Sequence, residues 1–171
     1  MNVIANGFPK HGNHALVKGL QLLGVPCQVN HIPCAEGVAG RHVFIKRDPR
    51  NALCSWLRFV GRPVTPGMFI TAFRDFDGRP LVAAMAEYEG WLADAGTLVI
   101  RYEDLIADSA VLRDISRTLE TPYIDGAFEA LPGLTRTWNA DHSDYRAIWT
   151  ADVEAVWAAE GGPDLLARWG Y

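Results

Sequence analysis

Short apolar runs alternate with helical patterns along the first hundred residues of the chain. The apolar runs lie at residues 2–7, 27–31, 42–46 and 97–100, and each is short enough to be a buried strand. Between them, apolar side chains recur at intervals of three and four residues, which is the period of an amphipathic helix. This alternation is typical of βαβ units. The sequence therefore predicts a three-layer α/β/α fold with a central parallel sheet.

Local signals predict where several helices begin and end. One helix is predicted over residues 13–23, because Gly-Val-Pro follows it, and another over residues 49–59, with a proline in its first turn. The most regular apolar spacing predicts a helix over residues 80–95. Further helices are expected after the capping residues Asp108 or Ser109 and Thr150. The segment Gly161-Gly162-Pro163 separates the last of these from a short final helix that ends at Trp169-Gly170-Tyr171.

Two stretches are predicted to lack regular structure. Residues 61–67 contain two prolines between two glycines, so we expect a loop there. Residues 121–149 also hold two prolines and two glycines among many polar groups. Because structureless segments of this length are uncommon in compact domains, we expect this one to be functional or mobile.

Composition narrows the classes of protein to which the chain can belong. A chain of 171 residues, 49% hydrophobic and 21% charged, suffices for one core, so we expect a single domain over residues 1–171. A net charge of −4 disfavours nucleic-acid binding but allows a local basic pocket for a small anion. The partner expected from this charge balance is a small molecule. Three cysteines without a C-x-x-C pair, and no apolar run of membrane length, favour a cytoplasmic protein.

The stretch Pro9-Lys10-His11-Gly12-Asn13-His14 joins the first predicted strand to the first predicted helix. The unpaired N–H groups and positive dipole end of a helix make such a junction an anion site. Gly7 and Gly12 have the spacing of a Walker A loop, but Asn13-His14 replace its Lys-Ser/Thr. A lysine inside the loop and the missing Mg²⁺-binding hydroxyl argue against hydrolysis of a nucleoside triphosphate. They favour a group transfer that needs no Mg²⁺.

Arg47, Asp48 and Pro49 follow the third predicted strand, and Ser55 lies on the helix after it. Ligands of open α/β sheets bind beyond the carboxyl ends of the strands. We therefore expect Arg47 and Lys10 to project into the same crevice.

In these segments the chain resembles the sulfotransferases that use 3′-phosphoadenosine 5′-phosphosulfate (PAPS). Pro9-Lys10-x-Gly12 is similar to the family's phosphosulfate loop, and Arg47-x-Pro49 with Ser55 is similar to its 3′-phosphate site. Three more segments resemble family segments in the same order: Asn30-His31-Ile32-Pro33, Arg101-Tyr102-Glu103-Asp104-Leu105 and Ser143-Asp144-Tyr145-Arg146. The resemblance implies the P-loop NTPase-like architecture of these enzymes.

The resemblance also implies roles for individual residues. Lys10 would stabilise the charge that grows on the leaving phosphate oxygen, and His31 would accept the proton of a hydroxyl or amine acceptor. No metal is required. The residues that would hold the nucleotide are Lys10, His11, Gly12, Asn13, His14, Arg47 and Ser55, with Tyr102 and Arg136 as helpers.

The chain departs from the family pattern at the nucleotide. Ala15 replaces an aromatic residue that stacks on adenine, and Trp138-Asn139-Ala140 replaces a late Arg-Lys-Gly, for which Arg136 would substitute. Two alternatives follow: a small kinase that uses ATP and Mg²⁺, and a relative that binds a nucleotide or a protein without turnover. The acceptor class stays open, although Trp56, Trp138 and Trp149 are candidates for its pocket.

Overall fold

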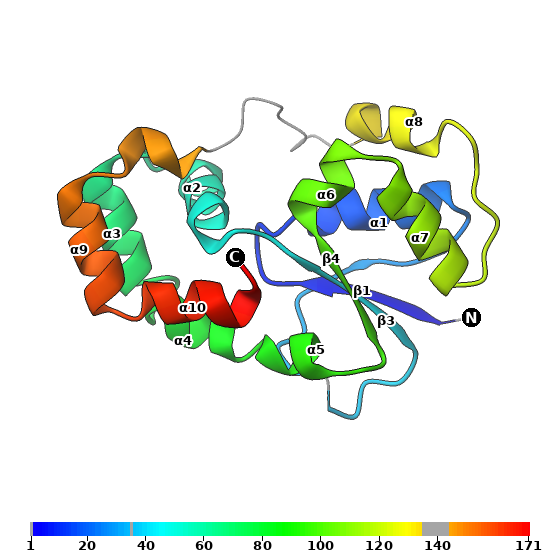
Figure 1. Cartoon of the computed structure of the whole chain (residues 1–171), viewed down its shortest axis with the longest axis horizontal. Helices are drawn as coiled ribbons and strands as arrows, with labels where there is room; N and C mark the ends of the chain where they lie inside the picture. The colour runs from blue at the N-terminus through cyan, green and yellow to red at the C-terminus, as the bar shows by residue number, and fades with distance from the viewer. Residues whose placement is uncertain (1, 35, 135–143) are drawn as a thin grey trace.

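A parallel sheet lies at the centre of the computed structural model, which describes residues 2–34, 36–134 and 144–171 (Figure 1). In these residues the sheet has four strands in the order β2-β1-β3-β4. The strands are β1 (Val3–Gly7), β2 (Val29–Asn30), β3 (Arg41–Lys46) and β4 (Thr97–Arg101). The predicted strand at 27–31 is thus reduced to two residues. The other three are confirmed to within one residue at either end.

The order of the strands opens a crevice between β1 and β3. These two strands pair from Val3↔Arg41 to Gly7↔Ile45. The chain leaves β1 toward β2 on one side, whereas it leaves β3 toward β4 on the other. The loops after β1 and β3 therefore diverge at the carboxyl end of the sheet, which is where parallel sheets bind ligands.

Helices cover both faces of the sheet, as the three-layer prediction requires. Val43 and Ile45 point to one face and Phe44 to the other, because side chains alternate along a strand. The helices on the face of Val43 are α1 (Asn13–Leu22), α7 (Ala110–Thr118) and α8 (Ala127–Leu134). Those on the face of Phe44 are α4 (Leu81–Ala86), α5 (Glu89–Ala93) and α10 (Gly162–Trp169).

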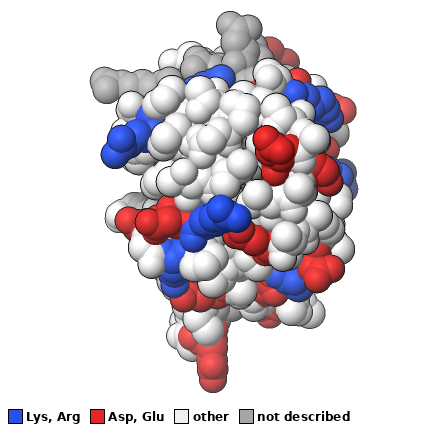
Figure 2. All heavy atoms as spheres, turned by 90° about the vertical axis from the view of Figure 1, so that its left-hand side faces the viewer, with Lys and Arg blue, Asp and Glu red and all other residues white. Residues whose placement is uncertain are grey.

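Further helices extend the layer on the Phe44 side away from the sheet (Figure 1). They are α2 (Pro49–Phe59), α3 (Pro66–Arg74) and α9 (Ala151–Ala159). On the face that α3 and α9 form, Lys and Arg side chains are interspersed with Asp and Glu (Figure 2). Arg74 of α3, for example, pairs with Glu160 after α9. Neither sign dominates the part of this face that the structure describes.

The predicted helix over residues 80–95 is interrupted. In the middle of this segment the hydrogen bonds span three residues instead of four, as in a 3₁₀ helix. The Tyr88 N–H donates to the Met85 carbonyl, and the Trp91 N–H donates to the Tyr88 carbonyl. Both halves still face the core, since Met85 and Trp91 are fully buried. The tightened turn also brings the Tyr88 hydroxyl to the His31 carbonyl, at 3.2 Å.

Other predictions of irregular structure were wrong in part. Helix α3 begins inside the predicted loop 61–67, because the Thr65 hydroxyl caps it by accepting from the Met68 N–H. The segment 121–149 contains α8 and a short 3₁₀ helix, Tyr145–Ile148. The sequence also missed α6 (Tyr102–Ala107), which follows β4 directly. In the described ranges, no helix has the length and apolar character needed to span a bilayer.

Candidate active site

A cavity of about 300 Å³ lies at the crevice between β1 and β3. Its lining comes from the loop after β1, the start of α1, the end of β3 and helix α2, and also from the segment after β2, the turn after α3 and the start of α6. Residues distant in sequence thus meet there. The predicted site residues in the lining are Lys10, Gly12, Asn13, His14, His31, Arg47, Ser55 and Tyr102. His11 is not in the lining, and Arg136 lies outside the described residues.

The loop after β1 is held in shape by its own backbone and by its neighbours. Lys10 and Gly12 have φ angles of 66° and 101°, in the left-handed region, and Gly12 leads into α1. A Cβ atom on Gly12 would lie 2.3 Å from the Tyr102 ring, so only glycine fits there. The first turn of α1 therefore offers its N–H groups to the cavity in a fixed arrangement.

Asn13 shapes this loop instead of presenting its side-chain amide to the cavity. Its Nδ2 donates to the Phe8 carbonyl at 2.9 Å and to the Gly7 carbonyl at 3.3 Å, and the residue is 4% exposed. The amide nitrogen is therefore engaged within the loop. Its backbone N–H remains at the helix terminus.

The sequence suggested that His11 would help to hold the nucleotide, but its side chain lies in the protein interior, outside the cavity lining. Its side chain is fully buried, and its Nδ1 accepts the Arg47 backbone N–H at 3.0 Å. The ring makes edge contacts with Phe8 and Trp169, at centroid distances of 5.3 and 5.1 Å. Burial, with added repulsion from Arg47 and His31, holds the pKa of His11 well below its usual value. The neutral ring thus joins the loop after β1 to the end of β3, with its proton on Nε2.

Arg47 places a buried positive charge in the lining of the cavity. Its side chain is 6% exposed, and its guanidinium carbon lies 4.5 Å from the centroid of the Tyr102 ring. Nη1 is 3.5 Å from the Lys10 carbonyl oxygen, and the buried Nε has no hydrogen-bond partner among the described residues. Burial lowers the pKa of Arg47, although a guanidinium stays charged at neutral pH. A buried cation of this kind is suited to an anion.

Lys10 provides the second positive charge of the lining. Its Nζ lies 3.8 Å from the centroid of the Phe59 ring, which is 71% exposed. Partial burial and the nearby Arg47 lower the pKa of Lys10. Neither Lys10 nor Arg47 forms an ion pair with a described carboxylate.

His31 is fixed by its contact with the first strand. Its Nδ1 lies 2.9 Å from the Gly7 carbonyl oxygen, which can only accept a hydrogen bond. The neutral ring therefore carries its proton on Nδ1 and leaves the Nε2 lone pair available. Asn6 holds the adjoining residue through two bonds, since its amide donates to the Ile32 carbonyl and accepts the Ile32 N–H.

His14 and Ser55 complete the polar lining. His14 is the second residue of α1 and is exposed. Partial burial and repulsion from Lys10, His31 and Lys18 lower its pKa. Ser55 lies on α2, half-buried. Trp56, beside it, also lines the cavity, whereas Trp149 packs against Phe69 and Tyr145 instead.

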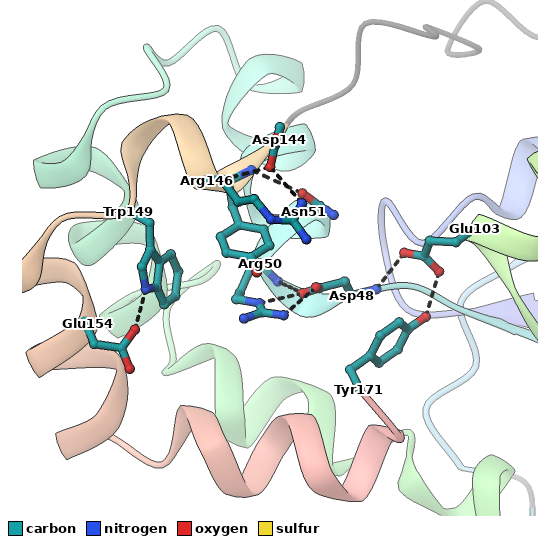
Figure 3. A network of polar contacts seen from close by, with 10 residues as sticks. Asp48, Arg50, Asn51, Glu103, Asp144, Arg146, Trp149, Glu154 and Tyr171 are labelled. Atoms are coloured by element: carbon teal, nitrogen blue, oxygen red, sulfur yellow. Dashed lines mark hydrogen bonds and ion pairs between the residues drawn. The ribbon is translucent and has the colours of Figure 1, made fainter.

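A polar network that sequence reasoning missed supports the end of β3 (Figure 3). Asp48 caps α2 and pairs with Arg50, with Oδ2 2.7 Å from Nη2. The Asp48 N–H donates to Glu103 at 3.1 Å, and the other oxygen of Glu103 accepts the Tyr171 hydroxyl at 2.9 Å. The chain segment that carries Arg47 is thereby tied to the first turn of α6, directly after β4, and to residue 171. The Tyr-Glu-Asp segment after β4 was the only sequence signal for it.

Over residues 2–34, 36–134 and 144–171, no three His, Cys, Asp or Glu side chains group as a metal site would require. Cys27 and Cys54 are thiols whose pKa is raised to about 11 by burial.

Comparison with solved structures identifies the class of fold. This α/β arrangement around a parallel sheet matches the fold of a solved sulfotransferase. A crystal structure of mouse sulfotransferase SULT7A1 complexed with PAP matches 93% of this chain and 82% of that chain, with a TM-score of 0.68. The identity between the two sequences is 13%, so the likeness concerns the fold. No family model and no curated protein matches the sequence.

Proposed function

We propose that this chain is a sulfotransferase that moves a sulfuryl group from PAPS to a hydroxyl or amine of a small acceptor. The observation that carries the proposal is the meeting of Lys10, Arg47 and His31 at one cavity beside the start of α1. These side chains come from three separate segments. Their meeting in a fold shared with a PAP-bound sulfotransferase supports a common site.

The cavity suits a nucleotide with phosphates at both ends of its ribose. The backbone N–H groups at the start of α1 would hold the 5′-phosphate. Arg47, with its buried and unpartnered Nε, and Ser55 would hold the 3′-phosphate. Because both cations of the lining lack a carboxylate partner among the described residues, their charges are available to these groups.

The transfer requires one bond to form and one to break. The acceptor oxygen or nitrogen attacks sulfur, and the bond from sulfur to the phosphate oxygen breaks, with its electron pair left on that oxygen. Lys10 would leave the Phe59 ring and stabilise this negative charge. His31 would take the acceptor proton on Nε2, the nitrogen that its bond to Gly7 leaves unprotonated.

A transfer assay with sulfur-labelled PAPS and a mixture of phenols, alcohols and amines tests the proposal. We expect label in an acceptor product without added metal, and its loss in Lys10→Ala and His31→Ala. Lys18→Ala is the matched control, because Lys18 lies on α1 outside the cavity lining. Transfer of phosphate from ATP with Mg²⁺, in place of sulfate transfer, would contradict the proposal and favour the kinase alternative.

A second candidate is a protein of this fold that binds the nucleotide without turnover. Ala15 lines the cavity and provides no aromatic ring for adenine, which favours this reading. A non-catalytic protein of this kind would bind adenosine 3′,5′-bisphosphate (PAP), but no acceptor would become labelled in the transfer assay. This alternative also predicts that His31→Ala leaves PAP affinity unchanged and alters no activity.

A further inference from the structure

Asn6 is a polar residue inside the apolar core. It lies in β1, where side chains two residues apart share a face, so it faces the same core as Ile4 and Phe8. The residue is fully buried and is not among the residues that line the cavity. The apolar pattern of the strand favours an apolar side chain at this position, and a buried amide is costly unless it is hydrogen-bonded. Its bonding partners therefore indicate what it does.

Both groups of the Asn6 amide bond to one residue on the neighbouring chain segment. Nδ2 donates to the Ile32 carbonyl at 2.8 Å, and Oδ1 accepts the Ile32 N–H at 3.0 Å. Residues 31–34 follow β2 and have no regular secondary structure. The last paired residues of β1 and β2 are Asn6 and Asn30. The Asn6 side chain thus extends the contact between these two segments beyond the end of the strand pairing.

The residue after Asn6 makes the complementary contact. The Gly7 carbonyl oxygen lies 2.9 Å from Nδ1 of the His31 ring. Two successive residues of β1 therefore hold two successive residues after β2: Asn6 bonds through its side chain to the backbone, and Gly7 bonds through its backbone to the side chain. The first contact places the backbone from which the ring projects, and the second fixes the direction of the ring.

Two side chains from the helical layer bond to the same two residues. The Tyr88 hydroxyl donates to the His31 carbonyl at 3.2 Å, and Trp91 Nε1 donates to the Ile32 carbonyl at 2.8 Å. Both side chains are held by the core, since Trp91 stacks on Phe44 and Tyr88 makes an edge contact with Phe8. The segment that carries His31 is therefore tied to the sheet and to the helices at once.

We infer that Asn6 and Tyr88 are positioning residues for His31. They hold its backbone where the ring keeps its proton on Nδ1, bonded to the Gly7 carbonyl, so that Nε2 stays unprotonated. This inference rests on the proposed function, in which Nε2 takes the acceptor proton. A neutral ring in the other tautomer would already carry a proton on Nε2 and could not accept one there. Neither residue lines the cavity, so each acts through His31.

NMR of protein with ¹⁵N-labelled histidine measures which ring nitrogen of His31 carries the proton. At about pH 8 an ordinary histidine is neutral, and His31→Ala identifies the His31 signals by their loss. We expect the proton on Nδ1 in the wild type. In Asn6→Leu and in Tyr88→Phe, the proton population should shift toward Nε2, because the backbone of His31 is no longer held opposite Gly7.

Two control variants remove a hydroxyl from the other face of the sheet. Ser116→Ala removes a buried hydroxyl that donates to the Thr121 carbonyl, and Tyr123→Phe matches the change in Tyr88→Phe. Both should leave the His31 signals unchanged, even where they lower the stability of the protein. The ring of His11 is an internal reference, since its Nδ1 accepts the Arg47 N–H and its proton should stay on Nε2 in every variant except those of His11 itself.

Sulfate-transfer kinetics supply a second readout that a general loss of stability would not move. Asn6→Leu should lower kcat by up to about 100-fold, as a small misplacement of a reacting group does. The affinity for PAP should not change. In a His31→Ala background, Asn6→Leu should lower kcat no further, because residues that act through one another are not additive.

The inference is overturned if the wild-type ring carries its proton on Nε2, or if the proton stays on Nδ1 in both Asn6→Leu and Tyr88→Phe. An equal loss of kcat from Asn6→Leu with and without His31 would also overturn it. If Asn6→Leu does not fold, Tyr88→Phe decides, since it loses one hydroxyl and keeps the ring. The NMR measurement needs neither PAPS nor an acceptor. Absence of transfer and of PAP binding in the wild type would contradict the proposed function, whereas the position of the proton would still decide whether Asn6 and Tyr88 hold the His31 ring.

Discussion

Replacement of His11 tests the interpretation that this residue joins two loops instead of contacting a phosphate. In His11→Phe, the ring contacts with Phe8 and Trp169 can persist, but the Arg47 N–H loses its acceptor. In His11→Asn, the side-chain oxygen lies near the position of Nδ1 and can still accept. The two variants therefore separate the hydrogen bond from the ring.

The expected cost follows from burial. Arg47 is almost fully buried, so its N–H would have no water to replace the lost acceptor. An unsatisfied buried donor costs about 1–3 kcal/mol, and we expect His11→Phe to lower the free energy of unfolding by that amount. His11→Asn loses packing but keeps the bond, so it should leave the Arg47 segment in place.

The pH dependence of stability gives an independent measure. The folded-state pKa of His11 lies below its unfolded value, so the unfolded chain binds the extra proton first as the pH falls. The wild type should lose stability below a pH of about 6.5, by up to about 1.4 kcal/mol per pH unit from this residue. Both variants lack this titration and should show a flatter profile.

Urea unfolding at several pH values between 5 and 8 measures both effects. His14→Gln is a necessary control, because the pKa of His14 is also lowered and contributes in the same direction. Equal stability of the wild type and His11→Phe at pH 8, together with parallel pH profiles, would refute the assignment. If His11→Phe and His11→Asn both weakened the binding of PAP to the same extent, direct contact between His11 and a phosphate would be favoured.

Three other perturbations follow from the site geometry. Gly12→Ala places a Cβ atom 2.3 Å from the Tyr102 ring at a φ of 101°, so urea unfolding should show a loss of about 1–3 kcal/mol; a neutral effect would contradict the fixed loop. Tyr171→Phe removes the 2.9 Å bond to Glu103 and should cost about 0.5–1.5 kcal/mol in the same assay, and no loss would mean that residue 171 is not tied to the site. In protein with ¹³C-methylated lysines, the Lys10 signal should titrate at lower pH than a free lysine, because burial and Arg47 lower its pKa, and PAP should raise that pKa; an unmoved signal would place the phosphates elsewhere.

Much of the fold could be predicted because strand and helix periods are local properties. The runs around Val3 and Val43 are apolar, and the side chains of β3 alternate between two cores. Their position in the sheet then brings Lys10 and Arg47 to one crevice, since the carboxyl ends of parallel strands lie together. The prediction that Lys10 and Arg47 share one crevice is therefore confirmed, whereas the roles of the two residues stay proposals.

The differences between the sequence-based expectations and the structure depend on contacts between distant segments. The Arg47 N–H turned His11 inward, and the Gly7 and Phe8 carbonyls engaged the Asn13 amide; neither contact can be read from residue type. The helix over residues 80–95 is likewise interrupted where Tyr88 reaches the His31 carbonyl. Tertiary contacts outweighed local pattern in each case.

Calorimetric titration with PAP, adenosine 3′,5′-bisphosphate, tests the central claim most directly. With a chelator present, we expect the wild type to bind PAP, and Ser55→Ala to bind it more weakly. Arg47→Lys keeps the charge but loses the planar fork, so it should weaken binding by about 10- to 100-fold, as the loss of hydrogen bonds to charged groups does. ATP with Mg²⁺ should bind less tightly than PAP. No binding of PAP to the wild type, or equal affinity in Arg47→Lys, would contradict a nucleotide site at this cavity.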